Sequence, residues 1–94
     1  MKAAIIESVQ VDDEHITFNL SDGRVLAAPT AWSSRLGQAT IEQRATYEIS
    51  AYGTIVGWPT IDEHIGLWTM LGVPEEDVLE SVGFDVGERK AATR

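Results

Sequence analysis

The fold is decided by residues 9–27, VQVDDEHITFNLSDGRVLA, in which apolar and polar side chains alternate on both sides of two turn signals. The dipeptide Asp22-Gly23 predicts a two-residue type I′ hairpin turn, because both central residues of that turn need positive φ. The turn sets the register of two antiparallel strands. The expected pairs are Leu20 with Val25 and Phe18 with Ala27.

A second tight hairpin is predicted at Asp13-Glu14, pairing Val11 with Ile16 and Val9 with Phe18. Side chains on a strand alternate between two faces, so the two registers together define an apolar face and a polar face. The apolar face is expected to hold Val9, Val11, Ile16, Phe18, Leu20, Val25 and Ala27. The polar face is expected to hold Ser8, Gln10, Asp12, His15, Thr17, Asn19, Ser21 and Arg24. The first 28 residues therefore predict a three-stranded antiparallel meander whose apolar face needs a cover.

Short helices are expected to supply that cover. Pro29 ends the third strand, and Trp32 and Leu36 lie four residues apart in a short helical or turn segment. Residues 40–43, TIEQ, have the form of a capping box, which predicts a helix start. The apolar stripe of that helix would consist of Ile41, Ala45 and Ile49.

The second half of the chain predicts a fourth strand over residues 54–58, stopped by Pro59. A helix should follow, with an apolar stripe of Ile61, Ile65, Trp68 and Leu71, and with Gly72 just past its end. A last helix over 74–82 would have Pro74 at its first position and Gly83 at its end. The predicted fold class is α+β, a three-stranded antiparallel meander plus a fourth strand, with one face covered by short helices. We expect one domain over residues 1–83 and a flexible polar tail over 84–94.

Composition limits the class of function. The 94 residues hold 7 Lys and Arg against 15 Asp and Glu, which gives a formal net charge of −8. This balance argues against direct nucleic-acid binding, because phosphate affinity depends on basic side chains. No apolar run has the length of a membrane span. The sequence has no cysteine and no export signal near its start, so a cytoplasmic protein is expected.

Motifs for catalysis are weak. Asp62-Glu63-His64 is a compact run of ionisable residues, but consecutive side chains do not converge on one point, and the run fits an acidic approach to a helix start. The serines and glycines form neither a nucleophile elbow nor a phosphate-binding loop. We therefore expect no catalytic residues, no metal site and no cofactor.

Partner binding is a better prospect for several large or charged residues. Trp32, Trp58 and Trp68 fall on three different predicted elements, where they would fill the core or expose a patch that anchors a partner. Arg35 and Arg44 are either ordinary surface residues or partners of Glu42, Glu48, Asp62 or Glu63 in ion pairs that fix loops to helices, and we favour the ion pairs. The candidate partner-binding residues are Trp32, Arg35, Arg44, Trp58, Asp62 and Glu63.

A series of short motifs carries a family resemblance over roughly residues 5–71. They are Ser21-Asp22-Gly23-Arg24, Ala31-Trp32, Arg35-Leu36, Ala39-Thr40, Glu42-Gln43-Arg44, Ile55, Trp58-Pro59 and Asp62-Glu63. In this order the chain resembles the short bacterial proteins grouped as domain of unknown function 2442. Ser34, Gly57 and His64 depart from that family's usual Pro, His and Asp. The segment from Val73 onward lies outside the pattern.

The resemblance implies a small α+β domain whose function is not established. Members of the family are often encoded beside another small protein and have been suggested to be the antitoxin-like halves of toxin–antitoxin pairs. No catalytic residue is carried over. Our first hypothesis is thus a non-enzymatic module that binds a basic protein, because the net charge would steer a cationic partner. The alternatives are an accessory domain of a DNA-binding regulator and, last, a small hydrolase that uses Asp62, Glu63 and His64. For residues 74–82 we expect packing on the domain or self-association through Val78, Leu79 and Val82.

Overall fold

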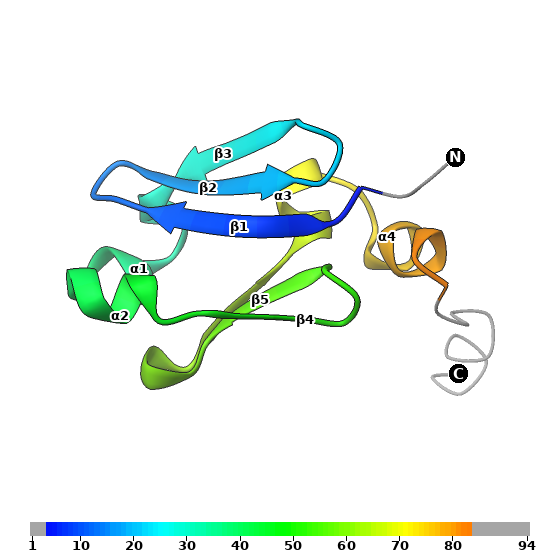
Figure 1. Ribbon diagram of the computed structural model, residues 1–94. Coiled ribbons are helices and arrows are strands. Elements are labelled where there is room, and N and C mark those ends of the chain that lie inside the picture. Colours follow the sequence, from blue (N-terminus) through cyan, green and yellow to red (C-terminus); the bar gives the residue numbers. More distant parts are fainter. Residues whose placement is uncertain (1–3, 84–94) are drawn as a thin grey trace.

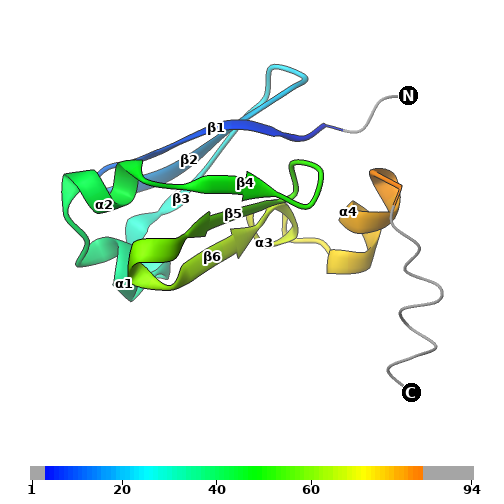
Figure 2. The same cartoon turned by 60° about the horizontal axis from the view of Figure 1, so that its bottom comes forward.

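Two three-stranded antiparallel sheets make up the domain in a computed structural model that describes residues 4–83. The first sheet has the order β1-β2-β3, with β1 Ile6–Val11, β2 His15–Leu20 and β3 Val25–Pro29. The second has the order β4-β5-β6, with β4 Glu48–Ser50, β5 Ile55–Trp58 and β6 Glu63–Gly66. Figures 1 and 2 show the second sheet facing the first.

Short helices close the ends of this arrangement. The 3₁₀-helix η1 (Thr30–Trp32), α1 (Ser34–Gly37) and α2 (Ile41–Ala45) connect the sheets at one end. A second 3₁₀-helix, η2 (Pro59–Ile61), joins β5 to β6, and α3 (Leu67–Leu71) and α4 (Glu75–Ser81) follow at the other end. Within residues 4–83, none of these helices is long and apolar enough to cross a membrane.

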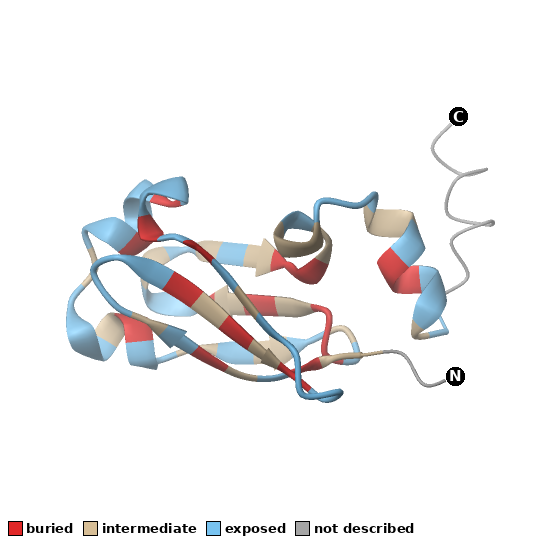
Figure 3. Ribbon diagram, turned by 90° about the horizontal axis from the view of Figure 1, so that it is seen from above, coloured by how far each residue is buried: buried red, intermediate tan, exposed pale blue. Residues whose placement is uncertain are grey.

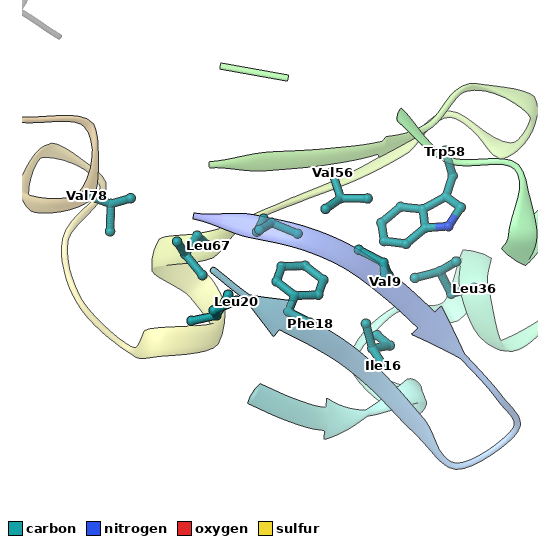
Figure 4. Close-up of a cluster of buried hydrophobic side chains, with 10 residues drawn as sticks. Val9, Ile16, Phe18, Leu20, Leu36, Val56, Trp58, Leu67 and Val78 are labelled. Carbon is teal, nitrogen blue, oxygen red and sulfur yellow. The ribbon is translucent and has the colours of Figure 1, made fainter. Parts of the chain in front are cut away.

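The hydrophobic core lies between the sheets. Phe18 and Ile16 of β2 point toward Val56 and Trp58 of β5, with Leu36 of α1 beside them (Figure 4), and all five are fully buried. Buried residues alternate with half-buried ones along β2 after the exposed His15 (Figure 3), so one face of this strand is covered more completely than the other. A sheet and not a set of helices therefore provides the main cover of the meander.

Hydrogen bonds also hold the two sheets together. The Val9 amide of β1 donates to the Tyr47 hydroxyl oxygen at 3.1 Å, and the Ile6 amide donates to the Gly53 carbonyl at 2.8 Å. Both acceptors come from the second half of the chain, beside β4. Part of the outer edge of β1 is thereby satisfied, which protects an edge strand from pairing with other chains.

The hairpin predicted at Asp13-Glu14, which is the first along the chain, is confirmed in its register. Val11 pairs with Ile16 and Val9 pairs with Phe18. The Asp12 carboxylate fixes the turn, because its Oδ1 accepts the amides of Glu14 at 2.8 Å and His15 at 2.7 Å. An aspartate that bonds the backbone two or three residues ahead stabilises a tight turn.

The register predicted for the second hairpin is wrong by one residue. Phe18 pairs with Leu26 and not with Ala27, because the loop contains Ser21 as well as Asp22 and Gly23. Gly23 has a φ of 92°, the positive value that a three-residue hairpin loop requires. One residue of slip exchanges the faces of a strand, so Leu26 and Ala28 face inward. Val25 and Ala27, which were expected in the core, are exposed.

The predicted fourth strand exists as β5, but it is the centre of a sheet and not a lone strand. The helix expected through Ile49 ends at Ala45, and Ile49 lies in β4 opposite Val56. The helix expected to begin at Ile61 begins only at Leu67, because Ile65 lies in β6 on the other side of Val56. Ile and Val are β-branched residues, which favour strands, and their contacts across neighbouring strands stabilise the sheet. Ile41, expected on a buried stripe, is 83% exposed.

Three helix-end predictions are confirmed. The capping box forms, with the Gln43 amide donating to Thr40 Oγ1 at 3.0 Å and the Thr40 amide donating to Gln43 Oε1 at 2.9 Å. Gly72 takes the left-handed conformation after α3, and Gly83 follows the end of α4 with a φ of 103°. Pro74 is the N-cap of α4 and not its first helical residue.

The last helix packs on the domain. Val78 and Leu79 of α4 are buried, and Val78 belongs to the hydrophobic core cluster. Figure 1 shows α4 beside α3 at the end where the chain begins. Val78 and Leu79 therefore pack α4 against the rest of the domain. The tail predicted over 84–94 lies outside the described residues.

Candidate functional site

A surface groove of about 400 Å³ runs along β6, and we call it the β6 groove. Its lining includes two tryptophans, Trp32 from η1 and Trp68 from α3, together with the polar side chains of Ser33, Glu63, His64 and Thr69. Its volume is in the lower part of the range of about 300–1,000 Å³ that is typical of ligand pockets. The groove has room for one large side chain or a small molecule.

Trp32 is the most unusual residue of this groove, because it is 62% exposed. The next residue, Ser33, fixes the segment that carries it. Ser33 Oγ accepts the Leu36 amide at 3.1 Å as the N-cap of α1, and donates to Glu63 Oε2 at 2.6 Å. Trp32 is thus held over the groove by a buried cap that is bonded to β6.

Trp68 forms another part of the lining and stands directly on Gly66. A Cβ atom added at Gly66 would lie 2.2 Å from two atoms of the Trp68 indole ring. Such a contact is far shorter than any van der Waals separation, so only glycine allows the ring to lie here. The half-buried Trp68 therefore depends on the glycine that ends β6.

Glu63 contributes a half-buried carboxylate at the start of β6. Its Oε2 accepts the Ser33 hydroxyl, and its Oε1 accepts the His64 amide at 2.9 Å. Two hydrogen bonds, one to each oxygen, fix the direction of this side chain. Because β6 is at the edge of its sheet, the Glu63 carboxylate also satisfies an amide of that edge strand.

Asp62 and Arg35 lie just outside the lining and form the ion pair that the sequence predicted. The Arg35 guanidinium donates to the Asp62 carbonyl and lies 3.4 Å from Asp62 Oδ2. Asp62 has a left-handed backbone with a φ of 52°. The Asp62 side chain is fully exposed, so solvent screens the pair and it contributes little to stability. Its role is to connect α1 to the turn before β6.

Arg44 and Trp58, both predicted as partner-binding candidates, are instead parts of the core. Arg44 Nε donates to the Leu36 carbonyl at 3.0 Å and Nη2 donates to the Gly37 carbonyl at 3.3 Å. The Trp58 indole donates to the Arg44 carbonyl at 3.0 Å. Both side chains are buried, Trp58 completely and Arg44 to all but 8% of its surface.

The acidic partner predicted for Arg44 is also wrong. Arg44 Nη1 pairs with Asp13 at 2.8 Å, and not with Glu42, Glu48, Asp62 or Glu63. The reason is that Arg44 turns inward from the last turn of α2 toward the carbonyls that end α1, which brings it to the tip of the β1–β2 hairpin. Sequence spacing contains no sign of that contact, because 31 residues separate the partners.

A second, smaller groove of about 260 Å³ lies beside β1. It is lined by Val11, Ile41 and Tyr47, among others, and it includes the exposed side chain of Ile41. Arg44 also lines it, but its guanidinium is fully engaged with Leu36, Gly37 and Asp13. This groove offers apolar surface with no carboxylate in its lining.

The polar side chains of Ser33 and Glu63 in the β6 groove are held by hydrogen bonds within the fold. The hydroxyl of Ser33 both donates to Glu63 and accepts from Leu36, which occupies it in a structural cap. Within residues 4–83 no three His, Asp or Glu side chains gather into a metal site. The groove presents aromatic surface and one oriented carboxylate.

Sequence reasoning named Trp32 and Glu63 as candidates, but it did not predict that Ser33, Trp68 and Thr69 lie beside them. Those contacts depend on the second sheet, which the sequence pattern did not reveal.

These features define a small two-sheet α+β domain with an aromatic, carboxylate-bearing groove at one sheet edge. Residues 6–72 match the family model described as protein of unknown function (DUF2442), and the chain belongs to that family. A protein of unknown function from Rhodospirillum rubrum has a similar crystal structure, with a TM-score of 0.63 and 20% identity. The likeness covers 90% of this chain and 96% of that one, and at this identity it shows the fold alone. No curated protein matches the sequence.

Proposed function

We propose that this protein is a non-enzymatic interaction module that binds a small basic protein through the β6 groove. The observation that carries the proposal is the exposed Trp32 ring, held beside the Glu63 carboxylate in a groove of about 400 Å³. Tryptophan is enriched among the few residues that dominate binding energy at protein interfaces. A tryptophan held in solvent by a rigid cap favours a surface made for contact.

The net charge supports a cationic partner. The formal charge of −8 attracts basic proteins over distances of about 10 Å at moderate salt and repels acidic ones. Opposite charge on two partners speeds association and selects against wrong partners. Under this proposal the chain is the antitoxin-like half of a pair whose other half is basic, and both act in the cytoplasm.

Two observations favour this function over the alternatives. The first turn of α4 carries Glu75, Glu76 and Asp77, and acidic side chains repel DNA phosphates, so this helix is a poor candidate for reading DNA. A hydrolase that uses Asp62, Glu63 and His64 would need their side chains to converge on one substrate. The Asp62 side chain instead lies fully in solvent beside Arg35, while the Glu63 oxygens accept the Ser33 hydroxyl and the His64 amide.

Calorimetric titration of the full chain with the products of the two genes beside its own tests the proposal. We expect a saturable complex of Kd about 1 μM or tighter with a basic product, weakened at least about tenfold between about 50 and about 500 mM salt. Trp32→Ala should weaken the complex by about tenfold or more. The control is Val25→Ala, which removes another exposed apolar side chain on β3. Absence of a saturable complex with either product, or equal effects of the two variants, would contradict the proposal.

A further inference from the structure

We propose that the β6 groove is a receptor for one arginine side chain of the partner, whose guanidinium pairs with Glu63 and stacks on Trp32 and Trp68. This inference rests on the proposed function and names the chemistry that the groove recognises. Three independent features lead to it: a carboxylate without a cation, its fixed orientation, and the two indoles around it.

Glu63 has no cationic partner among residues 4–83. The arginines in this part of the chain are each paired with an aspartate, Arg24 with Asp22, Arg35 with Asp62 and Arg44 with Asp13. Lysine does not occur between residues 4 and 83. The half-buried Glu63 carboxylate is therefore left available to an external cation, although Arg35 lies against the neighbouring Asp62.

The orientation of Glu63 suits a guanidinium. Each carboxylate oxygen already accepts one hydrogen bond, Oε2 from the Ser33 hydroxyl and Oε1 from the His64 amide. A carboxylate has about four acceptor positions, so one remains on each oxygen. Two parallel N–H donors are what arginine presents and lysine does not. Because the side chain is already fixed, pairing costs little conformational entropy.

The indole rings of Trp32 and Trp68 would bind the flat face of the same guanidinium. A guanidinium over the face of tryptophan gains a cation–π contact, and tryptophan is the strongest of the aromatic residues in this role. Trp32 and Trp68 line the same groove as Glu63, and Trp68 is held in position by its contact with Gly66. An exposed indole and a half-buried one in the same groove as a carboxylate form a site for a flat cation, whereas a neutral side chain would leave the carboxylate without a counter-charge.

The test is a titration of the full chain with short synthetic peptides, followed by NMR at the three tryptophan indole N–H groups. One peptide carries a single arginine among Gly and Ser residues, and the others carry lysine or citrulline in its place. Trp58 is an internal reference, because its indole is buried and bonded to Arg44. We expect saturable shifts at Trp32 and Trp68 with arginine, an affinity at least about tenfold lower with citrulline, and no shift at Trp58.

Two charge variants complete the test, with both the arginine peptide and the basic partner. Glu63→Gln should lower affinity at least about tenfold, whereas Glu48→Gln on β4 removes the same charge elsewhere and should have little effect. An unchanged Trp58 indole signal in Glu63→Gln shows that the core has folded. Equal binding of the arginine and citrulline peptides, or equal effects of the two variants, would overturn the inference. If the partner binds Glu63→Gln with wild-type affinity, the arginine site is wrong while the proposed function stands.

Discussion

Trp32 and Trp58 are the same residue type in opposite environments, and the difference predicts opposite effects on stability. Trp58 has no exposed surface and donates its indole N–H to the Arg44 carbonyl, whereas Trp32 is 62% exposed. Trp58→Ala should lower the free energy of unfolding by about 3–5 kcal/mol. Trp32→Ala should change it by less than about 0.5 kcal/mol. Urea denaturation measures both, and a loss above about 2 kcal/mol in Trp32→Ala would contradict the placement of that ring.

The two members of the Arg44–Asp13 ion pair should differ in how much they contribute to stability. The Arg44 guanidinium satisfies the carbonyls of Leu36 and Gly37 while it pairs with Asp13, whose side chain is 92% exposed. Arg44→Met should cost about 2–3 kcal/mol, because it removes the partners of carbonyls near the core. Asp13→Asn should cost less than about 1 kcal/mol, because an exposed ion pair contributes little. Comparable losses in the two variants, measured by urea denaturation, would show that the ion pair and not the carbonyl contacts holds α1.

Residue identity predicts partners well only where they are close in the sequence. The capping contacts between Thr40 and Gln43 were predicted because they span three residues. The contact between Arg44 and Asp13 was not, because it depends on how two elements pack. The same reason explains the tryptophans, since apolar spacing cannot tell the buried Trp58 from the exposed Trp32.

The two hairpin turns of the first sheet make stability depend on pH. Backbone amides, that of His15 and then that of Glu14, lower the pKa of Asp12 below 3.8, and the Arg24 amide does the same for Asp22. A pKa lowered by folding adds stability that is fully present above the unfolded value, and that stability is lost as pH falls through the folded values. Unfolding should therefore become easier as pH falls below about 3.8.

The measurement is the urea midpoint between about pH 5 and about pH 2. The double variant Asp12→Asn with Asp22→Asn keeps one side-chain oxygen at each turn to accept the backbone amides, but removes both titrating groups and the contact of Asp22 Oδ2 with Arg24 Nε. Its midpoint should fall less over this range than that of the wild type. An identical fall in the two proteins would show that acid acts on other carboxylates and not on the turns.

At the scale of elements, the sequence predicted the strands with local turn signals and misassigned those without them. Residues 12–15 form a turn that is recognisable from its own side chains, so the register of β1 with β2 was predicted correctly. The next loop includes Ser21, so the register of β3 differs by one residue from the prediction. The dipeptide Asp22-Gly23 is compatible with both a two-residue and a three-residue loop, so it could not decide between them. Ile49 and Ile65 satisfy helical spacing equally well, and only their pairing with Val56 shows that they belong to strands.

For the whole molecule, the second sheet creates both the core and the candidate site. By placing β6 at an edge, the order β4-β5-β6 brings Glu63 under the segment that carries Trp32. Composition alone indicated an acidic protein, and it could not say where on the surface a partner would bind. The location that we propose rests on a contact of Ser33 with Glu63 across 30 residues.

The most direct measurement is the set of backbone amide NMR shifts on adding the basic partner to the full chain. Our account predicts that the changes cluster on η1, on β6 and on the first turn of α3, around Trp32, Glu63 and Trp68. Changes centred instead on α2 and the outer edge of β1, around Ile41 and Tyr47, would place binding at the smaller apolar groove. That result would contradict the assignment of the β6 groove as the partner site.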